Sequence, residues 1–90
     1  MASSRPPARN FAYREADGFL DRAVQLVGSA EEWDEISLNF APLLCNAPDY
    51  GEVVVGDLRA ISLLTDPPLT VYYRVIEHER AVEMLTVEPV

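Results

Sequence analysis

The chain has 90 residues, enough for one small domain, and its hydrophobic content of 49% is ordinary for a soluble globular protein. Fifteen acidic residues outnumber seven arginines, there is no lysine, and the net charge is −8. Nucleic-acid binding draws much of its affinity from neutralising phosphates, so this charge makes direct nucleic-acid binding unfavourable. The sequence contains neither an apolar run of transmembrane length nor the apolar core of a signal peptide, so we expect a cytoplasmic protein without membrane contact.

The charge is unevenly distributed along the chain. Three of the arginines precede the first acid, Glu15, and from Glu15 onward four arginines face fifteen acids, a net −11 over 76 residues. Residues 1–9 show no periodicity, and we expect them to form a disordered arm before a single domain over residues 10–90. So acidic a domain suits a basic protein partner, or the charge serves only to keep the protein soluble.

The first element predicted in the domain is a short strand over Asn10–Arg14, where apolar and polar residues alternate. In the alternative interpretation, Phe11 and Tyr13 only pack the arm onto the helix that follows.

Two helices come next. Apolar residues recur at helical spacing over Glu15–Val27, and Gly28 is a typical helix-ending residue. Ser29 opens the second helix with a capping box completed by Glu32, and its buried stripe starts at Trp33. So short a break between the helices predicts an antiparallel helical hairpin packed on a sheet.

The rest of the chain reads as β-structure. Glu52–Val55 is either the entry to a strand or a loop packed on the core. Strands are predicted over Leu58–Thr65, Leu69–Glu77 and Arg80–Val87, because β-branched and aromatic residues are frequent there and proline-rich or polar turns separate them. The last turn is Glu77-His78-Glu79.

Strand periodicity places apolar residues on both faces of this sheet. In the central strand Tyr72 and Ile76 point away from Tyr73, and in the last strand alternation groups Val82 with Met84 on one face. Two helices can cover only one face of the sheet. We therefore predict a partner-binding patch on the other face, made of Tyr72, Ile76, Val82 and Met84.

Few side chains suggest chemistry. The weak catalytic candidates are Arg59, Arg74 and His78, since guanidinium groups on neighbouring strands, with Arg80, could hold a phosphate. The alternative is that each arginine pairs with a nearby acid. The single cysteine, Cys45, cannot form an internal disulfide or a metal site, and we predict neither a metal nor a cofactor.

The order of these pieces resembles the RelE/ParE toxin superfamily of bacterial type II toxin–antitoxin pairs. The resemblance lies in the turn Asn46–Gly51, in Asp57-Leu58-Arg59, in the strand Leu69–Ile76 and in the closing strand Val82–Val87, and it covers about residues 10–88. It implies an α+β fold with a short N-terminal strand and a two-helix hairpin packed on a small antiparallel sheet, in the order β-α-α-β-β-β.

The resemblance also implies a function. The chain would be the toxin-like component of a toxin–antitoxin pair, neutralised by a cognate antitoxin, with DNA gyrase or the ribosome as its target. Members of the RelE branch cleave messenger RNA with basic residues on the sheet, but only Arg59 and Arg74 fall on plausible family positions here, so ribonuclease activity is disfavoured. The alternative is a non-toxic, catalytically silent domain that forms homo-oligomers or binds another protein.

Overall fold

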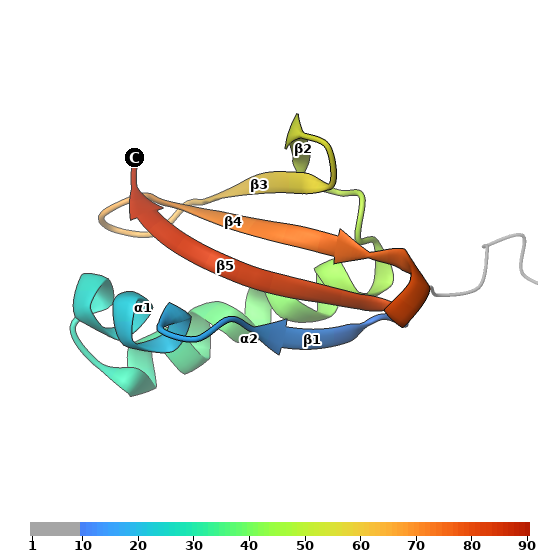
Figure 1. The fold of residues 1–90 in the computed structure, drawn as a ribbon. Coiled ribbons are helices and arrows are strands. Elements are labelled where there is room, and N and C mark those ends of the chain that lie inside the picture. Colours follow the sequence, from blue (N-terminus) through green and yellow to red (C-terminus); the bar gives the residue numbers. More distant parts are fainter. Residues whose placement is uncertain (1–9) are drawn as a thin grey trace, which may run out of the picture.

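The structure, a computed structural model, describes residues 10–90 and has two helices on one side of a five-stranded sheet (Figure 1). The predicted α+β architecture is confirmed, while the predicted arm, residues 1–9, lies outside the described residues. The elements are β1 (Ala12–Glu15), α1 (Phe19–Val27), α2 (Ala30–Asn46), β2 (Glu52–Val55), β3 (Leu58–Leu63), β4 (Leu69–Ile76), a 3₁₀ turn (Glu77–Glu79) and β5 (Ala81–Pro89). Neither helix within this range has the length and apolar character that a membrane span requires.

The sheet is mixed, with strand order β1-β5-β4-β3-β2. Strands β5, β4 and β3 pair antiparallel, as predicted, and Glu52–Val55, which the sequence left open between a strand entry and a loop, forms β2 antiparallel to β3. Strand β1 pairs with β5 in parallel, from Ala12 opposite Ala81 to Glu15 opposite Met84. The first and last strands of the domain therefore lie side by side (Figure 1). This pairing explains why α1 starts only at Phe19, because the residues up to Glu15 belong to the sheet.

The helix ends follow the local sequence signals. The Ser29 hydroxyl accepts the N–H of Glu32 at 3.1 Å, which confirms the predicted cap of α2. Gly28 closes α1 with a φ of 100° and donates its N–H to the Val24 carbonyl at 2.8 Å. The two helices are thus separated by only two residues, and they pack together on the sheet.

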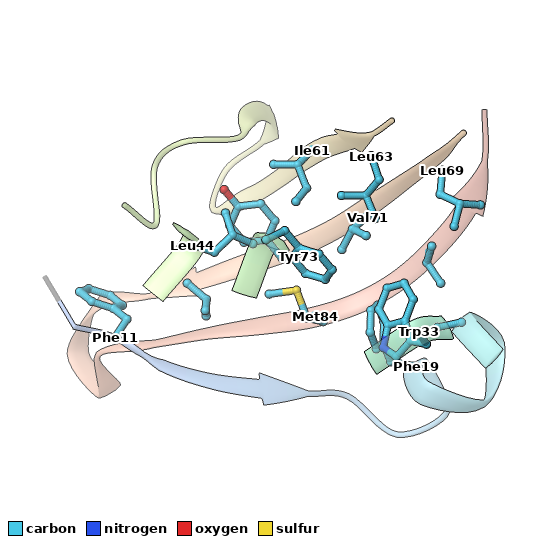
Figure 2. Close-up of a cluster of buried hydrophobic side chains, with 14 residues drawn as sticks. Phe11, Phe19, Trp33, Leu44, Ile61, Leu63, Leu69, Val71, Tyr73 and Met84 are labelled. Atoms are coloured by element: carbon cyan, nitrogen blue, oxygen red, sulfur yellow. The ribbon is translucent and has the colours of Figure 1, made fainter. Parts of the chain in front are cut away.

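The core lies between the helices and one face of the sheet (Figure 2). Trp33 is at its centre among the helices, with the rings of Phe19 and Phe40 at 5.6 and 5.7 Å between centroids. Val71 and Tyr73 of β4 close the core from the sheet side and are fully buried. Aromatic pairs at these separations add to the stability that comes from apolar burial.

A β-bulge in β5 corrects the predicted partner patch. Tyr72 pairs with Thr86 but its neighbour Tyr73 pairs with Met84, so Leu85 has no opposite residue on β4. The extra residue shifts the alternation by one, and Met84 joins Tyr73 on the helix-facing side. Val82 and Met84 are both 0% exposed, so the expectation that they lie on the open face is wrong.

Candidate partner-binding surface

The face of the sheet that the helices leave open still carries half of the predicted patch. Tyr72 and Ile76 are half-buried there, and no element within residues 10–90 covers this face, as Figure 1 shows. Cross-strand register places Ala60 and Thr86 beside Tyr72. The result is a small apolar strip across β3, β4 and β5, which is narrower than the sequence predicts.

Ion pairs flank this strip. Arg74 of β4 lies opposite Glu83 of β5 and contacts its carboxylate at 3.3 Å. Arg14 of β1 bonds Glu79 in the turn before β5, and this bond holds the pKa of Glu79 below its ordinary value. Both arginines on this part of the face are therefore neutralised by carboxylates.

Arg59 lies on the other side of the sheet from Arg74. It is directly opposite Tyr73, whose side chain points into the core, whereas Arg74 pairs with Leu58. Its guanidinium donates to the carbonyls of Gly51 at 2.6 Å and Asp49 at 3.1 Å. Arg59 therefore holds the loop between α2 and β2.

The remaining arginines of the described chain are also engaged. Arg22 of α1 contacts the Glu88 carboxylate at 2.6 Å, and Arg80 stacks over the ring of Phe11 at 5.1 Å. Each of the five arginines between residues 10 and 90 thus has a partner. The predicted cationic spot does not form, because Arg59, Arg74 and Arg80 are directed to different partners.

His78 lies apart from these groups. It is 82% exposed in the 3₁₀ turn, and its ring contacts the Glu79 carboxylate at 3.4 Å. Cys45 is half-buried, and burial raises the pKa of its thiol, which lowers its reactivity. No group of three or more histidine, cysteine or acidic residues within residues 10–90 is arranged to hold a metal ion. The three catalytic candidates are therefore not brought together.

Sequence reasoning missed the tyrosine that organises the loop before β2. The buried Tyr73 hydroxyl accepts the N–H of Gly51 at 2.9 Å and donates to the Pro48 carbonyl at 2.8 Å. A tyrosine in an otherwise apolar strand face was the available signal, since a buried hydroxyl requires a hydrogen-bond partner. Its partner could not be read from the sequence, because Gly51 is 22 residues away.

Comparison with solved structures identifies the fold. One similar structure is an Escherichia coli RelE toxin double mutant in complex with a peptide of the antitoxin RelB, with a TM-score of 0.68, 14% sequence identity, and coverage of 90% of this chain and 84% of that one. Another is the intact Escherichia coli RelBE toxin–antitoxin complex, with a TM-score of 0.63, 14% identity, and coverage of 89% and 96%. Neither a protein-family model nor a curated protein sequence matches the chain. The chain therefore has the fold of the RelE toxin.

Proposed function

We propose that this chain is the toxin-like subunit of a bacterial toxin–antitoxin pair, acting in the cytoplasm on a macromolecular target and neutralised by an antitoxin. The observation that carries the proposal is the match to RelE over nine tenths of the chain, in structures where that toxin is bound to antitoxin. The open apolar strip around Tyr72 and Ile76 supports it, because exposed apolar surface of this kind is typical of partner contacts.

The action that fits this surface is protein binding rather than RNA cleavage. Within residues 10–90, Arg14, Arg22 and Arg74 are in ion pairs, Arg59 is bonded to loop carbonyls and Arg80 lies over the Phe11 ring. The net −11 from Glu15 onward also repels a polyanion. Cleavage would also need a base and a phosphate-holding group close together, and Arg74 and His78 bind different carboxylates. DNA gyrase and a ribosomal component remain the two targets to compare.

The antitoxin should be basic or neutral where it meets the chain. Like charges facing each other across an interface reduce affinity, and opposite charges raise the association rate. An acidic surface on the toxin-like subunit therefore selects a partner segment that carries arginine or lysine.

Tightly controlled expression in a bacterial host tests the proposal. We expect growth arrest that the neighbouring open reading frame reverses. Phe40→Asp, which places a charge in the core beside Trp33, is the unfolded control and should be harmless. Tyr72→Ser and Ile76→Ser should weaken the arrest if the open face meets the target. Normal growth with soluble, folded protein present would contradict the proposal.

Labelling during the arrest separates the two targets. Early loss of thymidine incorporation would indicate gyrase, whereas early loss of methionine incorporation would indicate the ribosome. If Arg74→Ala abolished cleavage of messenger RNA by the purified chain, the protein-binding mode would be wrong.

A catalytically silent, self-associating domain is the second candidate, and the same strip favours it, since two copies could bury Tyr72 and Ile76 against each other. Sedimentation would then give a dimer that Tyr72→Ser dissociates, and induction would leave growth unchanged.

A further inference from the structure

The sheet has an unpaired edge along the second half of β3, beyond the first residue of β2. The register of β2 on β3 runs from Val55 opposite Leu58 to Glu52 opposite Ala60, so the last three residues of β3 have no strand beyond them. The chain enters β2 from Gly51, which is held down by Tyr73 and Arg59. This anchoring keeps the loop from continuing the ladder along β3.

Ser62 is the residue of this edge whose main-chain N–H and C=O point outward, away from β4. Val75 of β4 donates its N–H to the Asp57 carbonyl at 3.3 Å, and in an antiparallel pair the bonded positions alternate. Residues 59, 61 and 63 therefore point their main-chain groups toward β4, and Ser62 points its own outward. No bond from another described loop or turn reaches the Ser62 main chain.

A cavity lies beside this edge on each face of the sheet. On the helix side, a cavity of about 310 Å³ lies between α2 and β3, and Phe40, Leu63 and Leu64 supply much of its apolar wall. Leu64 is 100% exposed at its rim. On the open face, a cavity of about 510 Å³ is lined by Ser62, Thr70 and Tyr50, among others. Figure 2 shows Ile61 and Leu63 along β3, where the buried cluster meets this edge.

A third cavity continues the helix-side hollow toward the loop after β3. It measures about 400 Å³, shares Ile36 and Thr65 with the apolar cavity, and is walled by the carboxylates Glu32, Glu35 and Asp66. The far end of the edge is thus acidic, while its middle is apolar.

We propose that this edge receives an extended segment of a partner protein, which adds a strand to β3 beyond the first residue of β2. Side chains of an added strand alternate between the two faces, so successive residues would enter the two cavities that flank Ser62. An antiparallel strand, in line with β2, starts next to the acidic cavity. Its N-terminal residues are therefore arginine or lysine, and apolar residues at alternate positions follow them.

A second copy of this chain is a poor occupant. Its apolar strand β2 begins with Glu52 rather than with a cation, and its strand β1, which follows Arg9, is already paired with β5. A basic segment of a different protein satisfies the acidic cavity. The antitoxin is the first candidate for this partner. Only that identification rests on the function proposed above, and the site itself does not depend on it.

Selection of random eight-residue peptides, displayed on phage and panned on the immobilised full chain, tests the site. We expect enriched peptides with arginine or lysine followed by alternating apolar residues. Ser62→Pro should weaken their binding by about tenfold or more, because it removes the outward N–H, whereas Ser62→Ala should not. Leu64→Glu and Glu35→Gln should each weaken binding as well.

The outcome is decisive in either direction. If Ser62→Pro fails to fold, as judged by circular dichroism, the fully exposed Leu64→Glu and slowed exchange of the Ser62 amide in the complex decide instead. The site is wrong if no such peptide is enriched, or if enriched peptides bind Ser62→Pro or Leu64→Glu as tightly as the parent. If the antitoxin still restored growth to cells that express Ser62→Pro or Leu64→Glu, the proposed toxin function would be unaffected. The antitoxin would then not be the partner that occupies this edge.

Discussion

Tyr73 and Gly51 are joined by a buried hydrogen bond, in which the hydroxyl of the central strand accepts the main-chain N–H of the loop at 2.9 Å. The same hydroxyl donates to the Pro48 carbonyl. Burial raises the pKa of Tyr73 above its ordinary 10.0, so the hydroxyl keeps its proton for that second bond throughout the neutral range. The middle of the sheet therefore sets the path of the loop, and with it the point at which β2 starts.

Tyr73→Phe tests these two hydrogen bonds. The substitution leaves the Gly51 N–H and the Pro48 carbonyl without their partner in a buried place, so the free energy of unfolding should fall by about 1–3 kcal/mol. Urea unfolding measures the loss, and Tyr72→Phe on the open face is the matched control, expected to change stability by less than about 0.5 kcal/mol. Equal stability of Tyr73→Phe and the parent would show that the loop is held by other contacts.

Gly51→Ala should be more damaging than its single methyl suggests. A Cβ on Gly51 would lie 2.6 Å from the Tyr73 hydroxyl, 2.8 Å from the Ala60 carbonyl oxygen and 2.9 Å from Ile61. Because a main-chain carbonyl cannot move aside alone, we expect the free energy of unfolding to fall by about 2–3 kcal/mol, the upper part of the usual range for overpacking. Gly56→Asn, at a left-handed turn position with open space around it, is the control and should remain near parental stability in the same unfolding experiment. If Gly51→Ala lost no more stability than Gly56→Asn, the neighbours of Gly51 would have moved to make room for the methyl group.

Met84→Ala distinguishes the bulged register from an unbroken strand. With Met84 fully buried, truncation should lower the free energy of unfolding by about 2–5 kcal/mol. An unbulged β5 would place Met84 at the surface, where the loss would be below about 0.5 kcal/mol. Leu38→Ala, at a position 73% exposed, provides the surface reference in guanidinium unfolding.

Low pH should weaken the ion pairs Arg14–Glu79 and Arg22–Glu88, which lie near the two ends of β5. Arg14 lowers the pKa of Glu79, and the hydroxyl of Thr86 and then Arg22 lower that of Glu88, both from an ordinary 4.5. A carboxylate whose pKa is lower in the folded state stabilises the fold above its unfolded pKa, and this contribution disappears as the pH falls through the folded value. Stability should therefore decline below about pH 4.5.

The measurement is the urea midpoint between pH 7 and pH 3 for the parent and for the Glu79→Gln/Glu88→Gln variant. The variant should start lower at pH 7 and lose less on acidification, and added salt should narrow the difference because both groups are exposed. If the urea midpoint of the variant fell as much as that of the parent between pH 7 and pH 3, other carboxylates would be responsible for the acid sensitivity.

Local signals predicted most of the secondary structure correctly. The capping serine, the glycine that ends α1 and the proline-rich turn after β3 act within a few residues of themselves, so their effects can be read directly. The start of α1 was wrong by several residues, because pairing of β1 with β5 takes Glu15 into the sheet. Helical periodicity carries no information about a partner strand more than sixty residues later.

The candidate surface was only half predictable. Alternation located Tyr72 and Ile76 on the open face, since β4 is regular, but it failed for Val82 and Met84 because the bulge at Leu85 shifts the period of β5. The arginines illustrate the same limit. Arg59 and Arg74 are on neighbouring strands, yet their partners are loop carbonyls in one case and a cross-strand carboxylate in the other.

The sequence by itself determined the class of fold, the charge that disfavours nucleic acid and the two-helix hairpin. These follow from composition and short-range periodicity, which require no knowledge of distant contacts. Only the tertiary structure decided the parallel β1–β5 pairing, the bulge that buries Met84, the engagement of each described arginine and the open edge at Ser62. Each of these depends on which distant residues meet, and register and side-chain partners are settled by packing the whole sheet against the helices.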